Sequence, residues 1–215
     1  DVLAHVCERA AGDTLDNLLR THIFAPLGMT DTAFMVPSDK RDRLLPMFGV
    51  SDISEFAPLT PMPQELKYAN VEDMYPSTSA DFRRGGHGLF STTADYVRFA
   101  RMLISGRTPD GDVLLARKTL EMMRANRIPP EQLPLTIGMN PLPGYGWGLG
   151  VRVMMDAGKA MALTGEGELG WAGAASTYFF VDPAEDFFGV FMTQYLGAML
   201  PLSEEMRVAA YQMLP

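Results

Sequence analysis

The chain has 215 residues, of which 47% are hydrophobic and 20% are charged, so it can bury a core of its own and one domain is the default expectation. Its formal net charge of −8 argues against a nucleic-acid partner, because phosphates bind to basic surfaces. Every apolar run is shorter than the roughly 18 residues that a membrane span requires, so none is expected.

Two helices are predicted at the start of the chain. Apolar residues recur at helical spacing over 2–11, and Gly12 supplies the stop. The single cysteine, Cys7, cannot form an internal disulfide, and its place in an apolar helix favours a buried structural role. A lone cysteine leaves the cellular compartment open. The second helix is expected to start near Thr14 and to end at the Pro-Leu-Gly segment 26–28.

The middle of the chain alternates between loops and helices. Residues 31–86 are rich in proline and poor in periodicity, which favours a packed loop region that carries function. A hydroxyl three residues before an acid in 92–95 is a capping box, and it predicts a helix that ends at Gly106. Another helix is expected over 114–127, followed by a proline-rich loop through Pro143.

The last third of the chain carries the pattern of a sheet. Residues 145–153 alternate with a period of two, which predicts one strand, and glycines on one of its faces favour a helix packed close to it. Segments 170–183 and 187–195 read as a hairpin, and 203–213 as a closing helix. Strands joined by hairpins form an antiparallel sheet, so the expected fold class is α+β.

Small residues before the hairpin point to chemistry. Gly173 stands between two alanines, so another molecule can approach the backbone closely, and an unpaired strand edge there would offer N–H donors. Acyl transfer needs such donors to stabilise an oxyanion. A nucleophile is missing, however. The serines lack the flanking glycines of a nucleophile elbow, and the chain has no Ser-x-x-Lys.

Metal and cofactor chemistry finds no support in the sequence. The three histidines, His5, His22 and His87, stand far apart, and the spacings typical of zinc sites are absent. The chain also lacks a phosphate-binding loop, and the glycines of 146–150 lie within a strand pattern. We therefore expect neither a metal nor a cofactor.

Four segments together resemble the C-terminal half of the serine β-lactamase-like family, which includes class C β-lactamases, family VIII carboxylesterases and D-aminopeptidase-type enzymes. They lie in the same order with plausible gaps. The segments are 23–32 (IFAPLGMTDT), 85–92 (GGHGLFST), 145–150 (YGWGLG) and the hairpin from 170. The resemblance implies a β-lactamase/transpeptidase-like fold in which 1–143 form a helical and loop region and 144–215 supply sheet strands and the closing helix of a single domain.

The resemblance also implies a site. Trp171-Ala172-Gly173 occupies the place of the family's third motif, so Trp171 and Ala172 would contact substrate, Gly173 would leave room for the acyl group, and the Ala174 N–H would be one oxyanion donor. His87 would lie on the pocket wall. The plainer alternatives are that Trp171 is a core aromatic residue and that His87 is a solvent-facing loop residue.

In this family the Ser-x-x-Lys and Tyr-x-Asn motifs precede the Pro-Leu-Gly-Met segment, so the sequence would begin after both. Tyr68-Ala69-Asn70 matches the second motif literally but lies in the wrong place. The implied function is a serine hydrolase that acts on esters, amides or lactams, its nucleophile supplied by an N-terminal segment or a second chain, so this chain alone would be inactive. Tryptophan in place of lysine favours esters. The alternative is a non-catalytic module that binds an acyl or peptide ligand.

Overall fold

A computed structural model describes residues 1–49, 84–137, 140–196 and 202–215. Their contacts form two compact units, Asp1–Phe99 with Gln194–Ala198, and Ala100–Thr193 with Met199–Pro215. The helices are α1 Val2–Ala11, α2 Leu15–Leu19, α3 Ala25–Leu27, α4 Thr93–Ser105, α5 Arg117–Arg124 and α6 Leu202–Tyr211. A π-helical turn, η1 Arg20–Phe24, joins α2 to α3, and short 3-10 turns are η2 Ser38–Arg43, η4 Pro130–Gln132 and η5 Ala157–Lys159.

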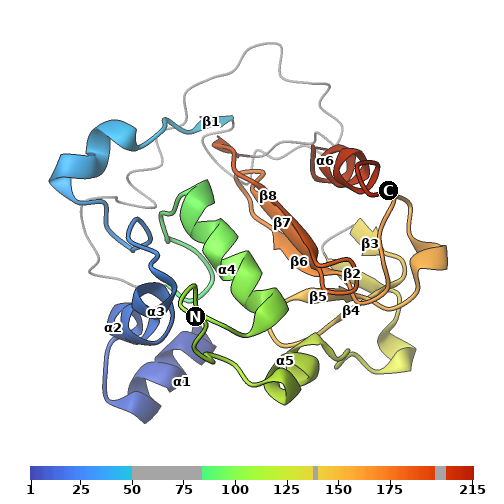
Figure 1. Ribbon diagram of the computed structural model, residues 1–215, viewed down its shortest axis with the longest axis horizontal. Helices are drawn as coiled ribbons and strands as arrows, with labels where there is room; N and C mark the ends of the chain where they lie inside the picture. The colour runs from blue at the N-terminus through green and yellow to red at the C-terminus, as the bar shows by residue number, and fades with distance from the viewer. Residues whose placement is uncertain (50–83, 138–139, 197–201) are drawn as a thin grey trace. The chain divides into compact units, whose positions relative to one another are not determined.

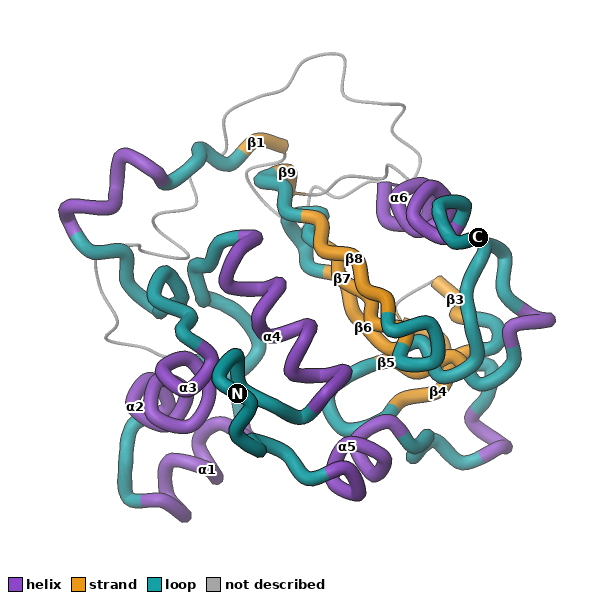
Figure 2. The backbone as a smooth tube through the Cα atoms, in the orientation of Figure 1, coloured by secondary structure: helices purple, strands orange, loops and turns teal. Residues whose placement is uncertain are grey.

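The first two helices begin and end as the sequence predicts (Figure 2). The Thr14 hydroxyl accepts a hydrogen bond of 3.3 Å from the Asn17 N–H at the start of α2. Gly12 and Gly28 both close their helices at a φ of 67°, a left-handed conformation that glycine adopts without steric cost. The local signals at these helix ends are therefore confirmed.

The burial predicted for Cys7 is wrong, because this residue of α1 is exposed. Val2 and Leu3 of the same helix are 81% and 74% exposed. Ala4 is the buried residue of the helix, and it joins Leu15 in a small cluster. The apolar pattern identified a helix correctly, but it could not say which of its faces another element covers.

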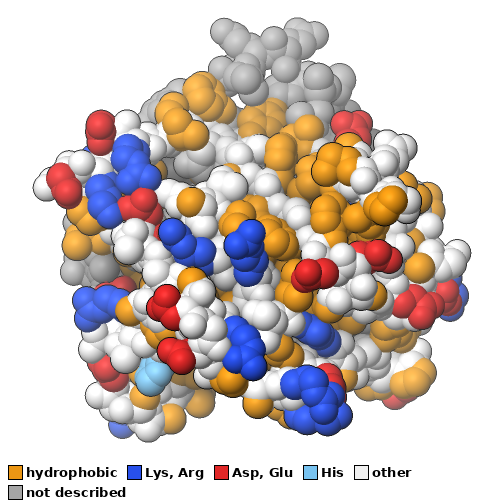
Figure 3. Space-filling model, viewed as in Figure 1, with side chains coloured by type: hydrophobic (Ala, Val, Ile, Leu, Met, Phe, Trp, Pro, Cys, Tyr) orange, Lys and Arg blue, Asp and Glu red, His pale blue; other side chains and the backbone are white. Residues whose placement is uncertain are grey.

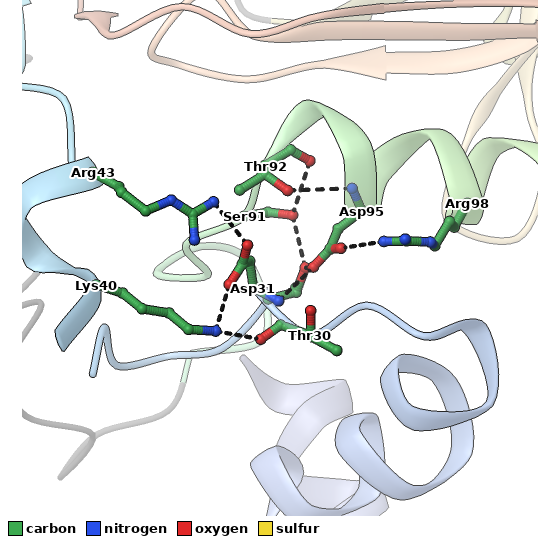
Figure 4. A network of polar contacts seen from close by, with 9 residues as sticks. Thr30, Asp31, Lys40, Arg43, Ser91, Thr92, Asp95 and Arg98 are labelled. Atoms are coloured by element: carbon green, nitrogen blue, oxygen red, sulfur yellow. Dashed lines mark hydrogen bonds and ion pairs between the residues drawn. The ribbon is translucent and has the colours of Figure 1, made fainter. Parts of the chain in front are cut away.

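A polar network ties the segment after α3 to the first turn of α4 (Figure 4). The Asp95 carboxylate, whose residue is 2% exposed, accepts hydrogen bonds from the Asp31 N–H at 2.7 Å and the Thr32 hydroxyl at 2.9 Å. The Thr92 hydroxyl accepts from the Asp95 N–H at 3.3 Å, which is the predicted cap. The carboxylate thus serves a long-range contact, and α4 ends at Gly106 as expected.

A five-stranded antiparallel sheet forms the centre of the second unit and confirms the α+β class (Figure 1). Its strands, in spatial as well as chain order, are β4 Tyr145–Trp147, β5 Arg152–Met154, β6 Leu169–Ala172, β7 Tyr178–Asp182 and β8 Phe187–Phe191. A separate hairpin joins β2 Leu135–Ile137 to β3 Asn140–Leu142, and β1 Phe48–Gly49 pairs in parallel with β9 Tyr195–Leu196.

The single strand predicted over 145–153 is wrong, because a turn with Gly150 at a φ of 84° divides it into β4 and β5. The close helix is confirmed. A Cβ on Gly148 would lie less than 3.0 Å from the carbonyl oxygen of Met123, a residue of α5. That helix covers Arg117–Arg124 and is shorter than the predicted 114–127.

The closing helix α6 packs on one face of the sheet, with contacts to β8. The ring of Tyr211 stacks on Phe180, the centroids 5.4 Å apart, and Phe180 is completely buried. The Tyr211 hydroxyl also donates a hydrogen bond of 2.7 Å to the buried carboxylate of Asp182. Among the described helices, none has the length and apolar character that a membrane crossing requires.

Candidate active site

The segment that the sequence singles out forms the end of β6 and a tight turn into β7. Trp171 and Ala172 are the last residues of β6. The Gly173 N–H then donates to the Thr177 carbonyl at 2.8 Å, and the Ser176 N–H donates to the Gly173 carbonyl at 3.0 Å. Ser176 has a φ of 60°, the left-handed residue of a three-residue hairpin loop.

The outer edge of β6 is open beside this turn. β6 pairs with β7 as far as Ala172, but it pairs with β5 only at Leu169 and Gly170. Ala172, Gly173 and Ala174 are exposed. Within the described part of the chain, the Ala174 N–H donates to no other residue. The donor predicted from the sequence therefore belongs to a hydrogen-bonded turn rather than to a strand, because β6 ends at Ala172 and β7 begins at Tyr178.

Gly173 has a reason of its own to be glycine. A Cβ at this position would lie less than 3.0 Å from the Thr177 hydroxyl oxygen. The same residue is exposed, so its missing side chain also leaves the surface of the turn free. Packing within the turn is enough to explain the glycine, and space for an acyl group is compatible with it.

Trp171 stands next to a second tryptophan. Its ring and that of Trp147 meet edge to face, with centroids 4.5 Å apart and planes at 80°. Both residues are half-buried. An edge-to-face arrangement is favourable because the positive ring edge meets the negative ring face. Trp171 is thus neither a fully buried core residue nor a freely rotating surface residue.

A buried ionic network lies in the strands beside the turn. Glu168, with 0% exposure, accepts hydrogen bonds from Arg152 at 3.3 Å and from Arg207 of α6 at 3.2 Å. Arg152 also donates to the Tyr178 hydroxyl at 2.5 Å, and Tyr178 pairs with Ala172 across β6 and β7. Burial raises the pKa of the Tyr178 hydroxyl, so the phenol is neutral. This network was not predicted from the sequence. Arg152, a charged residue within the apolar strand pattern of 145–153, was the signal that could have indicated it.

His87 belongs to the other compact unit, in the loop before α4. Its Nε2 lies 2.7 Å from Arg84 Nη1, and burial together with the Arg84 charge lowers the pKa of the imidazole. Because a guanidinium can only donate, Nε2 accepts and the imidazole is neutral with its proton on Nδ1. Tyr68 lies outside the described residues. Within those residues, no three His, Cys, Asp or Glu side chains are grouped so that they could hold a metal ion.

Comparison with known proteins shows the family of this chain. The model of the family described as β-lactamase matches residues 1–211. The chain belongs to the β-lactamase family. Among its family relatives, protein Rv1367c of Mycobacterium tuberculosis is 31% identical over 199 residues, which are 91% of this chain and 47% of that protein. Lovastatin esterase of Penicillium rubens is 29% identical over 224 residues, covering 96% of this chain and 51% of the esterase.

Solved structures of similar fold agree. EstCE1, described as a hydrolase with promiscuous acyltransferase activity, superimposes with a TM-score of 0.76 at 23% identity, over 98% of this chain and 54% of its own. A LovD6 mutant of simvastatin synthase from Aspergillus terreus gives 0.78 at 22% identity, over 100% of this chain and 54% of its own. The expected β-lactamase-like fold is confirmed, and the chain spans about half the length of the relatives it matches.

Proposed function

We propose that this chain is the C-terminal portion of a single β-lactamase-like domain in a serine hydrolase, which forms an acyl-enzyme on esters and, with less preference, on amides or lactams. Trp171 and Ala172 would line the acyl site, and the Ala174 N–H would donate to the oxyanion. The observation that carries the proposal is an exposed N–H, unpaired among the described residues, on a turn that two backbone hydrogen bonds close at the open end of β6. A donor in such a turn needs no reorganisation when negative charge develops, which is the requirement for oxyanion stabilisation.

The nucleophile and the second oxyanion donor would come from a segment outside this chain. Two observations support that division: the sequence contains no Ser-x-x-Lys, and it spans about half of each relative. The sheet offers a place for such a segment. Strand β8 pairs only with β7 among the described residues, and hydrophobic side chains gather over α6 and along β8 (Figure 3). An unpaired apolar edge strand readily accepts another strand.

Ester chemistry is favoured over lactam chemistry by the side chain at the entrance of the site. Trp171 brings no positive charge that would pair with a carboxylate, and Arg152 is already bonded to Glu168 and Tyr178. The names of two similar proteins, lovastatin esterase and EstCE1, also refer to ester or acyl-transfer chemistry.

A non-catalytic module that binds an acyl or peptide ligand is the second candidate. The same missing nucleophile favours this candidate, because binding a ligand requires no covalent step. The turn and the aromatic pair would then form the binding surface. The coding sequence upstream of Asp1 separates the two. A continuous reading frame with Ser-x-x-Lys and Tyr-x-Asn supports the enzyme, whereas a start codon at or just before Asp1 supports the module.

The direct test measures hydrolysis of a p-nitrophenyl ester by the 215-residue chain and by the intact protein. We expect no turnover by the chain alone, and turnover by the intact protein that a serine-directed phosphonate abolishes. Phosphonate-sensitive turnover by the purified chain alone would refute the proposal of a missing nucleophile. An intact protein that binds the ester without hydrolysing it would refute the enzyme.

A further inference from the structure

Trp147 and Trp171 are the two tryptophans of the chain, and they lie 24 positions apart in the sequence. Their rings nevertheless meet edge to face with a centroid distance of 4.5 Å. Such a pair contributes stabilisation beyond its buried area and holds each ring in one orientation relative to the other. The two residues differ in how firmly the rest of the protein holds them.

The backbone of Trp147 is fastened on both sides. Its N–H donates to Asn126 Oδ1 at 3.0 Å, and its carbonyl accepts from the Arg127 N–H at 2.7 Å. The Asn126 side chain is held in turn, because Oδ1 also accepts from the Ile128 N–H at 2.9 Å and Nδ2 donates to the Ile128 carbonyl at 2.9 Å.

The glycines on either side of Trp147 allow its backbone to lie very close to residues 123–126. A Cβ on Gly146 would lie less than 3.0 Å from Asn126 Oδ1, and one on Gly148 would lie less than 3.0 Å from the Met123 carbonyl. Trp147 therefore has little freedom to shift. Trp171, in contrast, stands on the part of β6 that β5 does not pair, next to an exposed turn.

We propose that Trp147 is a positioning residue for Trp171, and that the Trp171 ring held in this way forms an aromatic wall which selects flat, uncharged acyl groups over anionic ones. This inference rests on the proposed function, since Trp171 must face the substrate. The Trp171 ring offers a flat apolar surface and one N–H donor, so an aryl acyl group gains contact there. A carboxylate would lose its hydration there, and among the described residues Arg152 offers it no free positive charge, because Arg152 is already engaged by Glu168 and Tyr178.

The first test requires no catalysis. Two indole rings this close couple excitonically, so any couplet that the pair contributes to the circular dichroism spectrum must disappear in both Trp147→Phe and Trp171→Phe. Asn126→Ala keeps both rings but frees Trp147, so the couplet should shrink. In Trp147→Ala, the emission maximum of Trp171 should shift to the red, and the Trp171 ring should become more accessible to acrylamide. In Trp147→Phe, both properties should return toward the wild-type values. Unchanged Trp171 emission and unchanged acrylamide accessibility in Trp147→Ala would overturn the inference.

The second test uses the intact protein with 4-nitrophenyl benzoate and its anionic counterpart, mono-4-nitrophenyl succinate. Trp147→Ala should raise KM for the benzoate about fivefold, the value of one aromatic pair, with kcat nearly unchanged. Its effect should vanish when Trp171 is already alanine, because Trp147 acts through Trp171. Met161→Ala, at a residue 91% exposed, is the control. An equal loss of benzoate and succinate activity, or additive effects, would refute the inference.

Separate results would refute the proposed hydrolase and the proposed aromatic wall. If the intact protein hydrolyses neither ester, the proposed hydrolase is refuted, and quenching of tryptophan fluorescence by acetophenone then decides the aromatic wall. Saturable quenching by acetophenone, with an affinity that is about fivefold lower in Trp147→Ala, supports the wall as a ligand site. The anion benzoate should bind less tightly than acetophenone to the wild type. The same affinity in wild type and variant overturns it.

Discussion

The carboxylate of Glu168, the residue directly before β6, accepts a hydrogen bond of 3.2 Å from Arg207 of the closing helix α6. Arg152 binds the other oxygen of the same carboxylate, so two buried guanidinium groups depend on one negative charge. This relationship connects α6 to the strand that carries the candidate site.

Glu168→Ala should therefore be strongly destabilising. Removing the shared carboxylate leaves two buried cations without their negative counter-charge, which costs about 3–5 kcal/mol of unfolding free energy. Urea denaturation measures the loss. The matched control is Glu121→Ala, which breaks the exposed pairs with Arg117 and Lys118 and should leave the midpoint almost unchanged. Equal effects of the two variants would contradict a structural role for the buried network.

Gly148→Ala should lower stability by about 1–3 kcal/mol, the usual cost of forcing an extra carbon into a packed site. The new Cβ would meet a backbone carbonyl, that of Met123, which cannot rotate away. Gly86→Ala is the control, because a Cβ there would meet nothing within 4 Å. Thermal unfolding of both variants gives the comparison, and an unchanged midpoint for Gly148→Ala would show that α5 does not pack against β4 this closely.

Ala174→Pro should abolish most of the activity of the intact protein without unfolding it. Proline lacks the N–H, and loss of one oxyanion donor lowers kcat about 10²–10³-fold. The residue is the second of a turn that the Ser176–Gly173 hydrogen bond closes, a position where proline is favoured. Ala174→Gly keeps the N–H and should retain activity. Full activity of a folded proline variant would eliminate Ala174 as the donor.

The ion pairs of Asp31 should contribute to acid stability. Hydrogen bonds from Arg43 and Lys40 lower the pKa of the Asp31 carboxyl from 3.8 to about 2. Since the folded pKa is the lower one, their stabilisation is complete above pH 3.8 and is lost as the pH falls toward 2. The double variant Arg43→Gln, Lys40→Gln should bring the pKa of Asp31 back toward 3.8 in an NMR titration. Arg41→Gln, which makes no ion pair with Asp31, should leave that pKa where it is.

Helix ends and hairpins could be predicted because their signals are local. Thr14, Gly28 and Thr92 act on backbone groups within a few residues, so their chemistry is visible in the order of the chain. The β7–β8 hairpin also follows from two apolar runs and the turn residues between them. The split of 145–153 into β4 and β5 was missed, because a glycine in a period-two pattern is equally consistent with a strand and with a turn.

Burial depends on residues that are distant in the chain. Cys7 lies on a helix of the predicted length, yet it is exposed, because Ala4 rather than the apolar stripe meets its neighbours. The meeting of Trp147 with Trp171 has the same origin. It arises from strand pairing and from the bonds of Asn126, which no local pattern contains.

The order of residues was enough to establish an α+β chain, the segment of small residues at 172–174 and the resemblance to the β-lactamase family. Each of these depends on local spacing or on motifs in sequence order. The turn that presents the Ala174 N–H, the open edge of β6 and the sharing of Glu168 by two arginines emerged only from the three-dimensional structure. They depend on strand register and on long-range packing, which bring together groups that lie far apart along the chain.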